Sequence, residues 1–133
     1  MNDPFGSRIL TMDESDCKLY IIYRTDEQFI RDFHPELGQH AFYILFGHEP
    51  MNRRRQAYIG QTQNALSRFE QHKSTKDFWE CMCIFINAGE QFIRSEVQYL
   101  EYLGIKMAIE CASFDLLENC QVPAEPLLKK DQV

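Results

Sequence analysis

Short runs of β-branched and aromatic residues, each closed by turn residues, constrain this chain more than any other feature of its sequence. Four such runs occur, at residues 17–24, 41–46, 56–59 and 78–86. Runs of this length and composition are typical of single β-strands. None approaches the roughly 20 apolar residues that a membrane-spanning helix needs, so the pattern predicts a short sheet and no contact with a membrane.

Helical periodicity occupies the segments between these runs. Thr25 or Asp26 can cap a short helix that Pro35 ends, and Thr62 or Asn64 can cap a second helix that runs to about residue 72. The longest helix is expected at about 90–109. Its apolar residues at helical spacing form one stripe, made of Ile93, Val97, Leu100, Gly104 and Met107.

With 133 residues and 44% apolar content, the chain can build one core. We predict a single small α+β domain whose central short sheet of about three strands is flanked by helices, with an extra N-terminal strand and short helix. The predicted parts are an irregular segment at 1–16, the strand–helix extension at 17–37, the core at 38–120 and a loose tail at 121–133.

The net charge of −6 argues against a protein that coats nucleic acid through a broad basic surface. It still allows a few Arg and Lys side chains to hold one phosphate, because charges act locally within a Debye length of about 8 Å. The N-terminus has no basic start and no apolar core of a signal peptide, and the five cysteines are scattered. These features predict reduced, mostly buried thiols and a cytoplasmic location.

An ordered series of polar and aromatic residues carries the functional signal. Tyr43 lies in one predicted strand, Tyr58-Ile59-Gly60 lies in the next, and Arg68 and His72 follow on a helix. Glu101 on the long helix and Asn119 after it complete the series. Over residues 38–120 this series resembles the GIY-YIG nuclease superfamily, and in particular its small bacterial members. Each residue alone is typical of a core aromatic or a solvated helix face; only the ordered combination indicates a site.

The resemblance implies divalent-metal-dependent endonuclease hydrolysis of DNA, with RNA as an open alternative, and a single Mg²⁺ or Mn²⁺ held by Glu101. It implies that Tyr58 orients or deprotonates the attacking water with help from Tyr43. Arg68 would bind the phosphate, and His72 would move a proton or bind phosphate. Gly60 and Asn119 would contact the substrate.

The residue types suit this chemistry. Arg68 and His72 are four positions apart, so both side chains leave one face of a helix and can converge. The arginine fork matches phosphate oxygens, and Mg²⁺ often takes only one protein carboxylate and keeps its waters. Tyrosine, with an ordinary pKa of about 10, needs a neighbouring cation or metal to act as a base.

Some residues depart from the family pattern and leave alternatives open. The first motif reads Ala41-Phe42-Tyr43 instead of Gly-Ile-Tyr, and Gln61 stands where some relatives have lysine. The alternative function is therefore a weakly active or inactive module that binds nucleic acid or protein; a hydrolase of smaller phosphodiesters is a third. A protein partner or a homo-oligomer is equally open. The basic residues Arg53, Arg54 and Arg55 predict either a contact with the nucleic-acid backbone or a solubilising loop.

The long helix offers two candidate metal ligands, Glu96 and Glu101. At 100° per residue they lie about 140° apart around the helix axis, so both cannot face one site. Amphipathicity does not choose between them, since each flanks the predicted apolar stripe. The resemblance favours Glu101, which follows Leu100 and precedes Ile105 as the metal-binding glutamate of the family does.

Overall fold

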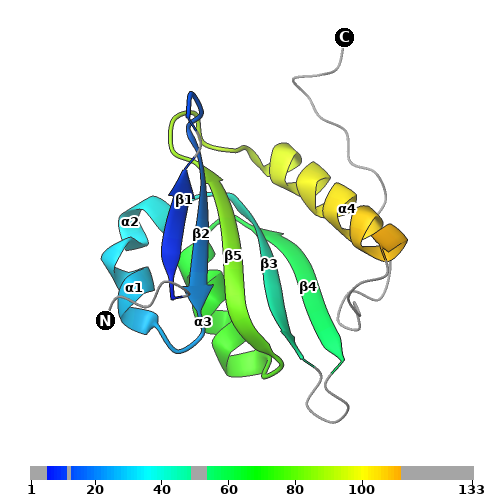
Figure 1. The fold of residues 1–133 in the computed structure, drawn as a ribbon. Coiled ribbons are helices and arrows are strands. Elements are labelled where there is room, and N and C mark those ends of the chain that lie inside the picture. Colours follow the sequence, from blue (N-terminus) through cyan, green and yellow to red (C-terminus); the bar gives the residue numbers. More distant parts are fainter. Residues whose placement is uncertain (1–5, 12, 49–53, 112–133) are drawn as a thin grey trace.

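The computed structural model describes residues 6–11, 13–48 and 54–111 as five strands and four helices. The strands are β1 (Arg8–Thr11), β2 (Cys17–Tyr23), β3 (Ala41–His48), β4 (Arg55–Thr62) and β5 (Trp79–Asn87). The helices are α1 (Glu27–Asp32), α2 (His34–Leu37), α3 (Ala65–Thr75) and α4 (Arg94–Cys111). The α+β class is confirmed, and all strands form one antiparallel sheet in the order β1-β2-β5-β3-β4 (Figure 1).

One face of this sheet builds the main core. Alternate side chains of the central strands point to this face and are fully buried, because successive residues of a strand face opposite sides. Helices α1, α2 and α3 cover it with Ile30, Leu37 and Phe69. The strand residues of this core include Tyr20, Ile22, Tyr43, Leu45, Met82 and Ile84.

Helix α4 lies on the other face, across β3 and β4 (Figure 1). Gly104 allows this close approach: a Cβ there would be 3.0 Å from Phe42 Cζ and 3.2 Å from Ile59 Cγ2. The residues of α4 that this packing buries are Val97 and Ile105. The predicted stripe was therefore wrong at both ends, since Ile93 and Met107 are 45% and 61% exposed. The contact at Gly104 sets the rotation of the helix.

The sheet is larger than the sequence predicted. The segment 1–16 was expected to be irregular, yet Arg8–Thr11 forms the edge strand β1 and pairs with β2 from Arg8↔Ile21 to Thr11↔Lys18. Strand β4 continues through Gly60 to Thr62, where a strand end was expected. Pro35 does not end helical structure; it lies in the first turn of α2, where its missing N–H costs nothing.

Two smaller expectations also changed. Cys17 is exposed and Cys81 and Cys83 are half-buried, so the described cysteines are less buried than predicted. In the part of the chain that the structure describes, no helix is both long enough and apolar enough to cross a membrane. The predicted tail at 121–133 and Asn119 lie outside the described residues.

Candidate active site beside the edge strand

Helix α3 carries two of the predicted site residues, and local contacts fix its start. The Asn64 side chain accepts a hydrogen bond from the backbone N–H of Ser67 (3.1 Å), which satisfies one of the free donors of the first turn. The Thr62 hydroxyl in turn accepts from the Asn64 N–H (3.1 Å). Asn64 is therefore the cap, and Thr62 orients the cap at the end of β4.

The C-terminal end of α3 is held from the neighbouring strands. The Arg24 guanidinium donates to the carbonyls of Lys73 and Lys76, each at 2.7 Å, and lies 4.9 Å from the centre of the Trp79 ring. The Trp79 indole N–H donates to the His72 carbonyl at 3.1 Å. Carbonyls at a helix end lack partners inside the helix, so these donors, one directly after β2 and one in β5, fix the position of α3.

Two tyrosines and a histidine meet between α3 and the sheet. The Tyr43 hydroxyl is 2.7 Å from His72 Nε2, and both side chains are almost fully buried. The ring centre of half-buried Tyr58 lies 6.2 Å from that of Tyr43 and 5.3 Å from that of His72. Tyr43 comes from β3 and Tyr58 from the edge strand β4, so the cluster joins three elements.

Gly60 makes room for the Tyr43 hydroxyl. A Cβ at this position would lie 2.5 Å from Tyr43 Oη and 2.6 Å from Cζ, much closer than atoms pack. Gly60 is opposite Tyr43 in the β3–β4 register. The glycine of the Tyr-Ile-Gly sequence thus has a role in the geometry of the cluster, whereas the sequence suggested only a substrate contact.

The cluster is neutral on its buried side. Burial, followed by the positive charges of Lys76 and Arg68, lowers the pKa of His72 to about 4, so its imidazole is uncharged at neutral pH. Burial first, then the neighbouring Tyr58, raises the pKa of Tyr43 far above its ordinary value. Tyr43 therefore keeps its proton. Within the described structure, His72 Nδ1 is buried and has no hydrogen-bond partner.

Glu101 approaches this cluster from α4. It lies one turn from Val97 and from Ile105, so it is on the packed side of the helix, and it is half-buried. Burial raises the pKa of the Glu101 carboxyl, and the Arg68 charge lowers it only in part. Glu101 also acts electrostatically on Tyr43. Tyr43, Tyr58 and His72 are thus in contact, and the charges of Arg68 on α3 and Glu101 on α4 act on this cluster electrostatically.

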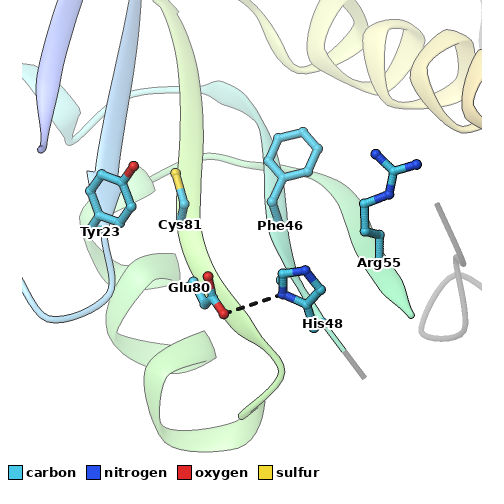
Figure 2. Close-up of a pocket in the computed structure, with 7 residues that line it drawn as sticks. Tyr23, Phe46, His48, Arg55, Glu80 and Cys81 are labelled. Carbon is cyan, nitrogen blue, oxygen red and sulfur yellow. Dashed lines mark hydrogen bonds and ion pairs between the residues drawn. The ribbon is translucent and has the colours of Figure 1, made fainter. Parts of the chain in front are cut away.

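The other predicted substrate contacts lie elsewhere. Arg55 pairs with His48 at the far end of the β3–β4 hairpin and, by strand alternation, faces the side opposite Tyr58. There it lines a hollow of about 290 Å³ with Tyr23, Phe46 and Cys81 (Figure 2). Arg54 is exposed at the same end, and Arg53 lies outside the described residues. The structure does not bring Arg55 to the tyrosine cluster.

A sixth residue, which the sequence analysis missed, belongs to the site. The Lys76 ammonium is 4.7 Å from the centre of the Tyr58 ring, and its charge contributes to the low pKa of His72. Lys76 is four residues after His72 and eight after Arg68. Continuing the same i, i+4 spacing by one step would have found it.

The donors present limit the kind of metal centre. Among the described residues, no three His, Cys, Asp or Glu side chains lie together as a metal-binding group. The carboxylate that acts electrostatically on Tyr43 and Arg68 is Glu101. This set suits a hard cation that keeps most of its waters, such as Mg²⁺, and does not suit a structural zinc.

Comparisons of the chain with protein-family models, with curated proteins and with solved structures found no match.

Proposed function

We propose that this chain is a divalent-metal-dependent endonuclease of the GIY-YIG type that hydrolyses phosphodiester bonds of DNA. The observation that carries the proposal is the convergence of Tyr43, Tyr58, Arg68, His72 and Glu101 beside β4. Stability alone does not require them: a buried histidine with an unpaired nitrogen and a half-buried carboxylate with a raised pKa both cost free energy. Groups kept in such environments are typical of functional sites.

Each residue has a role that its surroundings support. The Arg68 fork binds phosphate oxygens and stabilises the negative charge that builds up as water attacks. Tyr58, the less buried tyrosine, orients the attacking water. Tyr43 stays protonated because its pKa is raised, so it donates a hydrogen bond toward Tyr58. Neutral His72 is the last member of this hydrogen-bonded series, through its contact with the Tyr43 hydroxyl.

Glu101 would hold the metal ion. Ionised Glu101 is half-buried and only partly compensated by Arg68, so a divalent cation would offset negative charge at this place. A bound Mg²⁺ or Mn²⁺ would act as a Lewis acid on a phosphate oxygen and make its coordinated water more acidic. Arg68 would then bind the substrate phosphate. It does not need to form an ion pair with Glu101.

The proposal is tested by incubating supercoiled plasmid and a labelled oligonucleotide duplex with the purified protein and Mg²⁺ or Mn²⁺. We expect nicking or cutting that EDTA stops. Arg68→Lys should lose about a hundredfold or more, because lysine keeps the charge but lacks the planar fork. Arg31→Lys is the matched control, since Arg31 is exposed on α1 and pairs with Glu27.

Two outcomes would contradict the proposal. If Arg68→Lys turns over near the parent rate with an unchanged melting temperature, Arg68 is not the phosphate clamp. If the parent cuts no nucleic acid over a wide range of metal and salt, and binds no Mn²⁺, the chain is a binding module that has this fold without the activity.

A further inference from the structure

Three charged or polar residues follow one another at a spacing of four: Arg68 and His72 lie on one face of α3, and Lys76 comes directly after the helix. Lys76 closes the helix as its C-cap, and its backbone N–H donates to the His72 carbonyl at 2.9 Å. Eight residues at 1.5 Å per residue separate Arg68 from Lys76 by roughly 12 Å along the helix. Neutral, buried His72 lies between the two cations.

We propose that Lys76 binds a second phosphate of the substrate strand, separate from the phosphate that Arg68 holds. This inference rests on the proposed function and names a further residue that contacts its substrate. A nucleic-acid strand carries one phosphate about every 3.4 Å of duplex axis. The backbones of Arg68 and Lys76 are roughly 12 Å apart along the helix, which is several such intervals, so their side chains can reach different phosphates of one strand. A small diester has only one phosphate for both.

The surroundings of Lys76 support a binding role. Its ammonium lies 4.7 Å from the centre of the Tyr58 ring, so it borders the proposed catalytic tyrosine. Its carbonyl accepts from Arg24 at 2.7 Å, which fixes the backbone from which the side chain extends. A cation on a fixed backbone loses less conformational freedom when it binds a phosphate. In a chain of net charge −6, such local cations are what a polyanion requires.

Lys73 provides a matched control one turn earlier. It has the same charge and lies on the same helix, but its ammonium forms an ion pair with Glu27 of α1. Its carbonyl, like that of Lys76, accepts from Arg24 at 2.7 Å. Substituting either lysine by methionine removes one positive charge from the last turn of α3. Only the substitution of Lys76 removes a charge beside Tyr58.

The test measures cleavage of two substrates by Lys76→Met, Lys76→Arg and Lys73→Met. One substrate is a labelled 20-mer duplex, and the other is the p-nitrophenyl ester of thymidine 5′-monophosphate, which has a single phosphodiester. For Lys76→Met we expect kcat/KM on DNA to fall roughly tenfold at low salt. The slope of log kcat/KM against log salt should become shallower by about one. The loss on the small ester should be clearly smaller, because it has no second phosphate for Lys76 to bind, and Lys76→Arg and Lys73→Met should resemble the parent on both substrates.

Binding of the same duplex in EDTA, followed by fluorescence anisotropy, separates this inference from the proposed function. If the parent cleaves neither substrate but Lys76→Met selectively weakens duplex binding and its salt dependence, the nuclease proposal fails and the phosphate contact stands. Equal losses on both substrates would place Lys76 at the cleaved phosphate and overturn the inference. Unchanged activity and binding on DNA, with an unchanged melting temperature, would also overturn it.

Discussion

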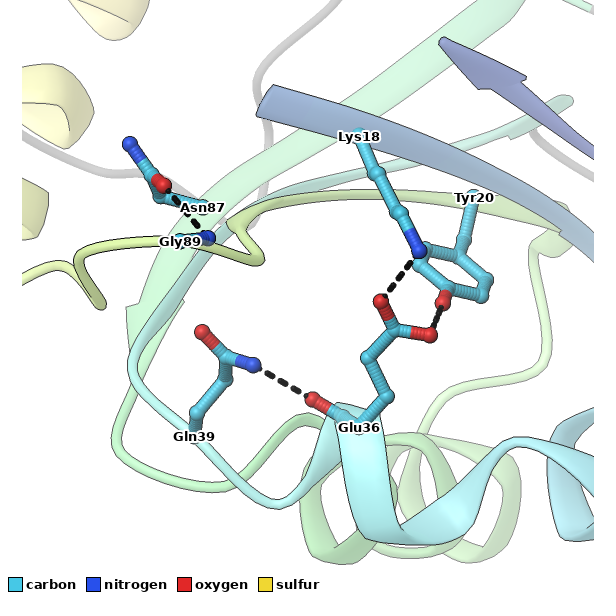
Figure 3. A network of polar contacts seen from close by, with 6 residues as sticks. All are labelled: Lys18, Tyr20, Glu36, Gln39, Asn87 and Gly89. Atoms are coloured by element: carbon cyan, nitrogen blue, oxygen red, sulfur yellow. Dashed lines mark hydrogen bonds and ion pairs between the residues drawn. The ribbon is translucent and has the colours of Figure 1, made fainter. Parts of the chain in front are cut away.

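Two clusters in this molecule combine a buried tyrosine, a glutamate and a cation, and their electrostatics are opposite. In the first, between β2 and α2, Lys18 Nζ donates to Glu36 Oε1 at 2.6 Å and the Tyr20 hydroxyl donates to Oε2 (Figure 3). Burial alone would raise the pKa of Glu36, but the hydrogen bonds from Lys18 and Tyr20 and the Lys18 charge lower it overall. In the second, the candidate site, the pKa of Glu101 is raised.

The difference lies in how each carboxylate is compensated. Both carboxylate oxygens of Glu36 accept a hydrogen bond within the protein, one of them from a cation, so the ionised form is the stable one. Around Glu101 burial outweighs the single cation, and His72 Nδ1 is buried without a partner in the described structure. The candidate site thus lacks the compensation that the Glu36 cluster has, and a phosphate with its metal ion would supply it.

The largest expected effect comes from Glu101→Gln. A neutral amide is a much poorer Mg²⁺ ligand, so we expect cleavage to fall by about a hundredfold to a thousandfold. Because the folded state raises the pKa of Glu101, its ionised form costs stability above that group's unfolded pKa. The variant should therefore be at least as stable as the parent in urea at pH 7. A clear loss of stability would mean that Glu101 is compensated like Glu36.

Gly60→Ala should have the next largest effect. The added Cβ would overlap the Tyr43 hydroxyl, and Tyr43 is buried and cannot swing away. Displacing this hydroxyl by a fraction of an ångström should lower kcat about tenfold to a hundredfold, with KM changed little. The matched control is Gly89→Ala, where a Cβ would meet only the side chain of exposed Asp16. Equal kcat in both variants would remove Tyr43 from the proposed mechanism.

The pH dependence of stability tests the neutral His72. Its pKa is about 4 in the folded state and about 6.5 when unfolded, so below pH 6.5 protons bind the unfolded chain preferentially. Between pH 7 and pH 4.5 this residue should reduce the free energy of unfolding by roughly 2 kcal/mol. In His72→Gln that share of the pH dependence should disappear. If the free energy of unfolding changed with pH in the same way in parent and variant, His72 would not be held neutral.

Glu36→Gln should act on stability and leave cleavage unchanged. Lys18 loses its ionic partner while Tyr20 can still donate to the amide, so we expect a loss of about 1 kcal/mol at pH 7. The folded pKa of Glu36 is lowered, so its contribution is present above the unfolded pKa. It is lost as pH falls through the folded pKa. Urea unfolding at pH 7 and pH 3 checks both statements; a difference that persists at pH 3 would contradict the ionic account.

Sequence pattern was sufficient for the presence of β2 to β5 and of α3, whose cap it narrowed to Thr62 or Asn64. It missed β1, because the turn before β2 contains Glu14 at φ 61°, a left-handed conformation that sequence rules assign to glycine or asparagine. It could not set the rotation of α4, which depends on the contact of Gly104 with Phe42. Arg24 was missed because its role arises from hydrogen bonds to the end of α3, which is distant in sequence.

The smallest effect is expected for Glu96→Gln. Together with Glu101→Gln, this variant tests which of the two glutamates of α4 is the metal ligand. Glu96 Oε1 accepts from the backbone N–H of Ile93 at 3.0 Å, which caps the first turn of the helix. The amide oxygen of glutamine can accept the same bond, and the lost charge at the helix start costs only about 0.3–0.5 kcal/mol. Metal-dependent cleavage should stay at the parent level, and thermal melting should shift slightly. If instead Glu96→Gln abolished cleavage and Glu101→Gln did not, the metal ligand would lie at the helix start, away from Arg68, and the proposed site would be wrong.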